Sequence, residues 1–162
     1  MRSEHYFAYG SNLSIARLRR RLPGVEPLAT GHVSGFELTF HKVSDVDGSG
    51  KCDIAPADVD TFGLIYRVTM AEIAMLDRIE GGYERVELTV LRADGPALRA
   101  WSYRARYVDP ELRPYGWYHH HVLAGAQAAG LPQSHIERIA GQPTWRDPDR
   151  ERARRERAIH VE

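Results

Sequence analysis

The chain has 162 residues, the usual length of a single domain and enough to bury a hydrophobic core. Hydrophobic residues make up 43% of it, but no stretch approaches the roughly 18 apolar residues of a membrane-spanning helix. Lys and Arg number 22 and Asp and Glu also number 22, so no net charge attracts nucleic acid or a membrane surface. We therefore expect no nucleic-acid or membrane partner, while a homodimer stays open.

The N-terminus and the cysteine content predict a cytoplasmic protein. The first ten residues, MRSEHYFAYG, lack the apolar core of a signal peptide and enter a strand almost at once. Cys52 is the single cysteine, so no disulfide can form within the chain. Small neutral or zwitterionic molecules fit this balance of charges better than large charged partners do.

The first half of the chain predicts strands separated by turns. Residues 4–9 form an expected strand, and apolar residues at helical spacing follow over residues 14–22. Residues 35–41 alternate in polarity, and residues 62–68 form a third strand. Residues 42–61 between these strands are polar, with Gly, Asp and Pro, and predict a long loop that is interrupted by a short strand near residues 52–55. A loop of that length in a compact domain is more often functional than idle.

The second half mixes helices with strands. The pattern predicts a helix over residues 70–80, a hairpin of two strands over residues 85–108, and a helix over residues 114–129. Ser134 and Glu137 have the spacing of a capping box for a last short helix.

Strands dominate the middle of the chain and helices do not alternate regularly with them. This order predicts the α+β class, with a small mixed β-barrel flanked by helices. Residues 1–147 form the expected catalytic domain. Residues 148–162 are charged and have no apolar face, so they predict a solvated tail, with a helix as an open alternative to an extended chain, loosely attached at best.

Several short segments resemble metal, nucleophile or nucleic-acid sites, but each lacks a residue or a geometry that such a site requires. Residues 45–50 open like a calcium loop, yet Pro56 occupies the place that needs a bidentate Glu. Residues 119–121 are three histidines that point about a hundred degrees apart on a helix, so one ion cannot use all three. Cys52 has no local signature of a nucleophile. The arginines of residues 17–21 are interpreted as a solvated face. No metal site is predicted.

The turn Tyr9-Gly10-Ser11-Asn12-Leu13 follows a strand and precedes a helix. Gly10 has no Cβ, so the backbone can turn sharply there and approach a ligand closely. The first amides of the next helix would point at whatever lies above the turn, a place that suits a carboxylate or a developing oxyanion. A simple strand-to-helix turn with Asn12 or Ser14 as the cap fits the same residues equally well.

The helix predicted over residues 70–80 has a carboxylate on its apolar face, where charged residues are unusual. Thr69 and Glu72 form an expected capping box at its start. Ile73, Leu76 and Glu80 fall on one face, which is the apolar face of the helix. Burial and the negative end of the helix dipole would both raise the pKa of Glu80. Glu80 is thus a candidate for proton transfer, and a Glu that reaches solvent at a frayed helix end is the alternative.

Four segments follow one another in a recognisable order: FAYGSNL at residues 7–13, FGLIY at residues 62–66, LDRIEG at residues 76–81, and GA with GLP at residues 125–132. Together they resemble the motifs of the gamma-glutamylcyclotransferase-like family, over about residues 5–140. The resemblance implies a small barrel flanked by helices. It also implies an acyltransferase that releases 5-oxoproline from gamma-glutamyl compounds without a cofactor or metal.

The resemblance also implies roles for particular residues. The turn from Tyr9 to Leu13 would bind the gamma-glutamyl group, and Glu80 would be the catalytic acid/base. Tyr83, Tyr103 and Tyr118 fall where the family places aromatic hydroxyls around the substrate, although each also suits a barrel or interface aromatic. The leaving group would be an amine or a peptide. The alternative is a non-catalytic small-ligand-binding or interaction protein that retains the same pocket.

Overall fold

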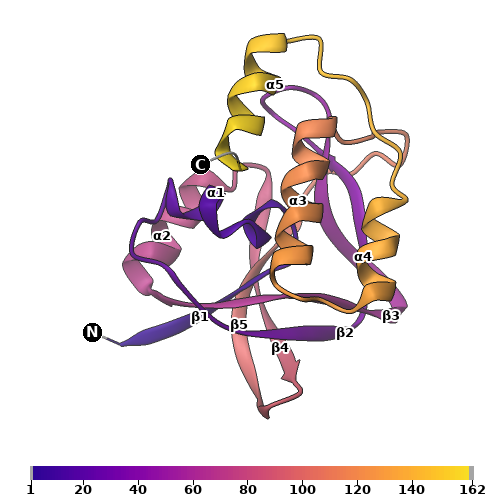
Figure 1. Ribbon diagram of the computed structural model, residues 1–162. Coiled ribbons are helices and arrows are strands. Elements are labelled where there is room, and N and C mark those ends of the chain that lie inside the picture. Colours follow the sequence, from indigo (N-terminus) through magenta and orange to yellow (C-terminus); the bar gives the residue numbers. More distant parts are fainter. Residues whose placement is uncertain (1, 161–162) are drawn as a thin grey trace.

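Helices flank one mixed β-sheet in the computed structural model, which describes residues 2–160 (Figure 1). The strands within these residues are β1 (Ser3–Ala8), β2 (Glu26–Val43), β3 (Gly50–Thr69), β4 (Tyr83–Arg92) and β5 (Gly95–Ala105). Their order is β1-β3-β2-β4-β5, and a single parallel pairing of Tyr6 with Trp101 closes the sheet between β1 and β5. The other pairings between these strands are antiparallel. The predicted α+β class, with helices around a mixed sheet, is confirmed.

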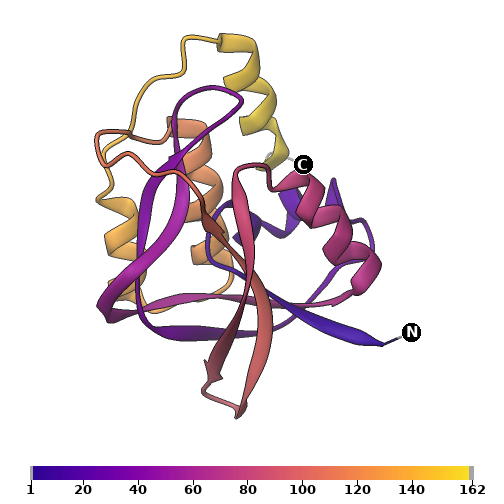
Figure 2. The ribbon, with the colours of Figure 1, turned by 180° about the vertical axis from the view of Figure 1, so that it is seen from behind.

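The helices gather in three places around the sheet. They are η1 (Ser11–Leu13), α1 (Ile15–Arg19), α2 (Met70–Ile79), α3 (Gly116–Ala128), α4 (Gln133–Ala140), α5 (Arg150–Arg157) and η2 (Ala158–His160). Figures 1 and 2 show α2 on one side of the molecule and the α3–α4 pair on the other, with α1 and η1 between them. Within the described residues no helix has the length and hydropathy needed to cross a bilayer.

Residues 42–61, predicted to form a long loop, belong mostly to two long strands. β2 and β3 pair antiparallel from Glu26 opposite Arg67 to Val43 opposite Gly50, so only residues 44–49 remain as the turn. The pairing passes three register shifts, and Pro56 lies beside one of them. The middle of β3, residues 56–60, is largely exposed, and an antiparallel pair with a solvated face accepts polar residues. The prediction of a long loop was therefore wrong, whereas the short strand predicted near residues 52–55 is part of β3.

Of the two capping boxes predicted from the sequence, one is present in the structure and one is not. The Thr69 hydroxyl accepts the Glu72 amide at 3.2 Å and the Glu72 carboxylate accepts the Thr69 amide at 3.0 Å, which confirms the capping box of α2. The capping box expected at Ser134 is wrong, because α4 begins at Gln133 with Pro132 as its N-cap. Pro132 has a non-helical ψ of 140°, and Ser134 lies inside the first turn of the helix, so it cannot be the N-cap.

The C-terminal segment packs against the rest of the protein instead of forming the expected loose tail. Figures 1 and 2 show α5 next to the end of α3. The carboxylate of Asp147 accepts hydrogen bonds from the Trp117 indole at 2.7 Å and from the Arg152 guanidinium at 2.5 and 2.7 Å. Ala153 and Ile159 are buried. These two buried side chains are too few to give a repeating hydrophobic pattern in the sequence, so the sequence did not predict that this segment packs against the protein.

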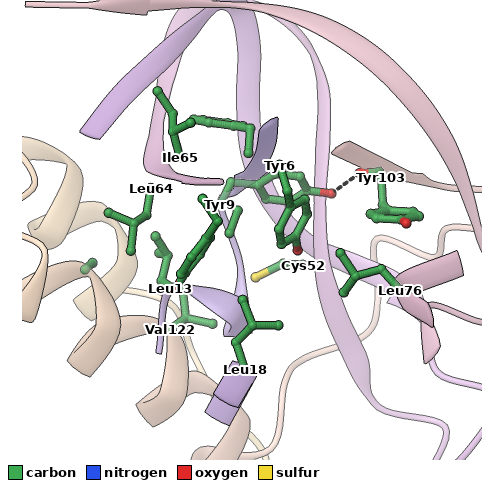
Figure 3. Packing of buried hydrophobic residues seen from close by; sticks show 14 of the residues in the cluster. Tyr6, Tyr9, Leu13, Leu18, Cys52, Leu64, Ile65, Leu76, Tyr103 and Val122 are labelled. Atoms are coloured by element: carbon green, nitrogen blue, oxygen red, sulfur yellow. Dashed lines mark hydrogen bonds between the residues drawn. The ribbon is translucent and has the colours of Figure 1, made fainter. Parts of the chain in front are cut away.

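The core draws side chains from strands and helices alike, as Figure 3 shows. Ile65 of β3, Leu18 of α1, Leu76 of α2 and Val122 of α3 are fully buried in one cluster. The Tyr9 hydroxyl donates a hydrogen bond to the Tyr103 carbonyl across this cluster. The turn after β1 is thus held between the sheet and α3.

We expect Gly125→Ala to destabilise the fold. A Cβ at Gly125 in α3 would lie 2.5 Å from the carbonyl carbon of Leu13 and 2.6 Å from the amide nitrogen of Ser14. Because both are backbone atoms, the helix or the turn must move, and overpacking of this kind costs about 1–3 kcal/mol. Denaturant unfolding measures the loss.

The matched control is Gly24→Ala, where a Cβ would meet no atom within 4 Å. Its free energy of unfolding should change by no more than about 0.5 kcal/mol. Equal stabilities of the two variants would contradict the close packing of α3 on the turn.

Candidate active site

A cavity of about 210 Å³ lies between the turn after β1, the C-terminal end of α2 and the tip of the β2–β3 hairpin. Most of the residues that the sequence singles out line it: Tyr9, Gly10, Ser11, Asn12, Glu80, Tyr83, Tyr103 and Tyr118. Leu13 is the exception, because it is 1% exposed and lies in the core beside Val122 (Figure 3). The short 3₁₀ turn directs successive side chains to different sides, which takes Leu13 away from the cavity.

The turn itself differs from its expected geometry. Gly10 has φ −114°, so it does not need the left-handed region. Its Cβ would instead lie 2.8 Å from the Cβ of Cys52, so the glycine permits a close approach between the turn and β3. The amides of Leu13 and Ser14 donate to carbonyls within the turn at 3.0 and 3.1 Å. Of the amides expected to face a ligand, those of Ser11 and Asn12 are therefore the ones without a partner in the turn.

Asn12 connects the turn to Glu80. Its Nδ2 donates to Glu80 Oε1 at 3.1 Å and to the Tyr6 hydroxyl at 2.9 Å. The Tyr66 hydroxyl donates to the backbone carbonyl of Asn12 at 2.8 Å. Asn12 Oδ1 is buried and has no hydrogen-bond partner within residues 2–160. A buried acceptor without a partner is costly, and a ligand that brings a donor would satisfy it.

Glu80 is the C-cap of α2, and its amide donates to the Leu76 carbonyl at 2.8 Å. Burial raises the pKa of Glu80, as the sequence predicted. Four neighbours oppose that rise, in the order Arg21, Arg17, the hydrogen bond from Asn12, and Lys42. The carboxylate is thus desolvated and at the same time compensated by positive charge, which suits a group that accepts and returns a proton.

The three predicted tyrosines use their hydroxyls differently. The Tyr83 hydroxyl donates to the Cys52 carbonyl at 2.7 Å, and the Tyr103 hydroxyl donates to Asp77 Oδ1 at 2.7 Å. The Tyr118 hydroxyl accepts the Cys52 amide at 2.9 Å and also forms a hydrogen bond with the Cys52 thiol. Burial raises the pKa of all three, and they stay neutral at neutral pH.

The sequence did not predict several residues that line the cavity. The main ones are Tyr6 and the cations Arg17, Arg21, Lys42 and Lys51. The second half of β1 is buried on both faces, so no alternation of polarity marks Tyr6. Arg17 and Arg21 were interpreted as a solvated face, although their i,i+4 spacing directly after the turn is a signal that could have found them. The two lysines lie on strands within or beside the predicted loop.

Cys52 and the three consecutive histidines have the following surroundings in the structure. Burial raises the pKa of the Cys52 thiol to about 12, so it stays protonated. His119 Nε2 lies 2.7 Å from the Ile139 carbonyl, whereas His121 Nδ1 lies 2.6 Å from His160 Nε2. No group of three or more His, Cys, Asp or Glu side chains in the described part of the chain could hold a metal ion.

Comparisons with known proteins agree with the motifs. Residues 60–139 match the AIG2-like family. Gamma-glutamylcyclotransferases of Mus musculus and Bos taurus are 29% and 27% identical over 144 residues, which cover 83% of this chain and 76% of each relative. A solved gamma-glutamyl cyclotransferase shares the fold with a TM-score of 0.89 at 22% identity, over 99% of this chain and 100% of that one.

A second solved structure, an uncharacterized protein from Homo sapiens, has a TM-score of 0.87 at 24% identity and covers 98% of this chain and 99% of its own. These structures show that the whole described chain, the C-terminal helix included, follows one known fold. With the matching motifs and the curated relatives, they show that the chain is similar in sequence and in fold to gamma-glutamylcyclotransferases.

Proposed function

We propose that this protein is a cyclotransferase that releases 5-oxoproline from a gamma-glutamyl amine or peptide. The observation that carries the proposal is the buried contact between Asn12 and Glu80, which brings the glycine turn and a proton-accepting carboxylate into one cavity. The gamma-glutamylcyclotransferases among the relatives support it.

In the reaction the α-nitrogen of the substrate loses two protons and the leaving nitrogen gains two. The Glu80 carboxylate takes one proton from the α-ammonium group, and the neutral nitrogen then bonds to the γ-carbonyl carbon and closes a five-membered ring. Glu80 gives this proton to the leaving nitrogen, and the bond from the γ-carbon to that nitrogen breaks. Glu80, again a carboxylate, takes the second proton from the ring nitrogen and passes it to the departing amine, which leaves as an ammonium group. A positioned acid/base contributes about a hundredfold to ten-thousandfold, and holding the chain folded for an intramolecular attack lowers the barrier further.

Neighbouring groups can hold the substrate for this attack. Asn12 Oδ1 is an unused acceptor beside Glu80 and suits the α-ammonium group. The amides of Ser11 and Asn12 suit the γ-carbonyl oxygen or the α-carboxylate, and the Tyr118 hydroxyl lies in the same cavity. Tyr9, Gly10, Tyr83 and Tyr103 would shape the walls.

Two further expectations belong to this proposal. The turn of residues 44–49 contributes Ser44, Asp45 and Val46 to the cavity and would shape the side of the leaving amine. The single cysteine is buried and unpaired, which fits the reducing cytoplasm. Residues 1–147 would hold all groups that contact the substrate.

The purified protein should release 5-oxoproline from a gamma-glutamyl compound, and the rate should not change when metals are chelated. The chemistry above moves only protons between Glu80 and the substrate. A screen of gamma-glutamyl dipeptides and amines, with and without EDTA, measures this. Activity that disappears with EDTA and returns with added metal would contradict the cofactor-free reaction, and ligand binding without any product would favour a binding protein.

Glu80→Gln should fold and bind substrate but lose about a hundredfold or more in turnover, because the amide cannot accept the ammonium proton. Glu72→Gln is the matched control on the same helix, since it removes the same charge at a cap far from the chemistry. Both variants are assayed for 5-oxoproline, with a thermal melt for folding. Near-wild-type turnover in a folded Glu80→Gln would exclude Glu80 from the reaction.

The pH profile of kcat/KM should show an acid limb above the pH at which an ordinary glutamate titrates. Burial raises the pKa of Glu80, and the reaction needs its deprotonated form in the free enzyme. Arg21 is the largest influence that lowers this pKa, so Arg21→Met should move the acid limb to still higher pH. An acid limb that stays in place or moves to lower pH would contradict this electrostatic account.

A further inference from the structure

The C-terminal helix reaches the wall of the cavity through one ion pair. Arg17 on α1 lines the cavity, and its side chain is 11% exposed. Arg17 Nη1 lies 2.8 Å from Oε1 of Glu156 on α5, a side chain that is 20% exposed. Such a short, largely buried pair is a charge-assisted hydrogen bond of the stronger kind. A residue outside the predicted catalytic domain therefore contacts a residue of the site.

Two histidines form a series of close contacts that ends at Glu156. His121 on α3 is fully buried, and its Nε2 lies 3.8 Å from Glu156 Oε1. His121 Nδ1 lies 2.6 Å from His160 Nε2. One arrangement fits both distances: His160 donates to His121 Nδ1, and His121 carries its proton on Nε2, toward Glu156. His121 and Arg17 lower the pKa of Glu156 to about 2, so it remains a carboxylate at neutral pH.

The charges around the cavity favour an anionic group on the ligand. Four cations line it against two carboxylates: Arg17, Arg21, Lys42 and Lys51 against Asp45 and Glu80. Arg17 Nε is buried and has no hydrogen-bond partner within residues 2–160, so the guanidinium keeps an unused donor despite its bond to Glu156. A planar guanidinium with free donors matches the geometry of a carboxylate.

Resting on the proposed cyclotransferase function, we propose that Arg17 contacts a carboxylate of the gamma-glutamyl substrate. We further propose that Glu156 is the positioning residue that holds Arg17 at the cavity wall. Glu156 acts on the substrate through Arg17, because its own carboxylate faces Arg17 and His121. The C-terminal helix is then part of the substrate site although it provides no group that touches the substrate.

A double-mutant cycle tests the pair. Glu156→Gln, Arg17→Met and the double variant are compared for 5-oxoproline release from gamma-glutamylalanine, with KM and kcat measured separately. Each single change should raise KM about tenfold, the usual worth of a hydrogen bond to a charged group, and change kcat less. The double variant should be no worse than Arg17→Met alone, because the effect of Glu156 passes through Arg17. Glu151→Gln, an exposed glutamate on the same helix, should change neither constant.

A second substrate locates the carboxylate. Gamma-glutamylethylamine has no carboxylate on its leaving amine. If Arg17→Met raises KM for both substrates, Arg17 contacts the glutamyl carboxylate. If it raises KM for gamma-glutamylalanine alone, Arg17 contacts the leaving group. Both outcomes support the contact, and an unchanged KM for both substrates overturns it.

The cycle also separates this inference from the proposed function. Additive effects of the two changes in an active wild-type background would overturn the positioning role and leave the cyclotransferase intact. Absence of 5-oxoproline from the wild-type protein with every gamma-glutamyl compound would overturn the proposed function and this inference with it. If Glu156→Gln fails to fold, Glu156→Asp keeps the charge but withdraws the carboxylate by one methylene. An unchanged KM in folded Glu156→Asp would then count against the positioning role.

Discussion

The side-chain amide of Asn12 connects the two parts of the chain on which the candidate site depends. It donates to Glu80, 68 residues later, and to the Tyr6 hydroxyl on the neighbouring strand. The Tyr66 hydroxyl holds the Asn12 backbone from the other side. Because both donors of the amide are used within the protein, its orientation is defined before a ligand binds. The remaining acceptor, Asn12 Oδ1, lacks a partner in the described residues, which is a reason to expect a ligand with a donor there.

Opposing electrostatic effects act on the carboxylate that Asn12 holds. Burial raises the pKa of Glu80, while the cations Arg21, Arg17 and Lys42 lower it. A buried carboxylate without these charges would stay protonated and could not act as a base, and one in water would be a poor acid. The same cations leave the cavity with more positive than negative side chains. The same cations can thus bind an anionic substrate and lower the pKa of Glu80.

Long-range contacts bring these residues together. The β2–β3 hairpin carries Lys42 and Lys51 to the cavity, and the close approach at Gly10 places the turn against β3. The ion pair between Arg17 and Glu156 joins residues 139 positions apart. The long hairpin and the first turn thus meet the end of α2 at the cavity, and the last helix contacts Arg17 at the cavity wall.

The sequence by itself determined the features that depend on near neighbours: the capping box of α2, the β4–β5 hairpin, the glycine turn, and Glu80 on a buried helix face. Each rests on hydrogen bonds or side-chain periods within a few residues, which a linear pattern records. Only the tertiary structure decided that most of residues 42–61 belong to two long paired strands, that Leu13 turns away from the cavity, that Arg17 lines it, and that the charged C-terminal segment packs. These outcomes depend on which distant groups pair and bury one another, and strand pairing and desolvation of a charge are properties of the assembled fold, not of the local sequence.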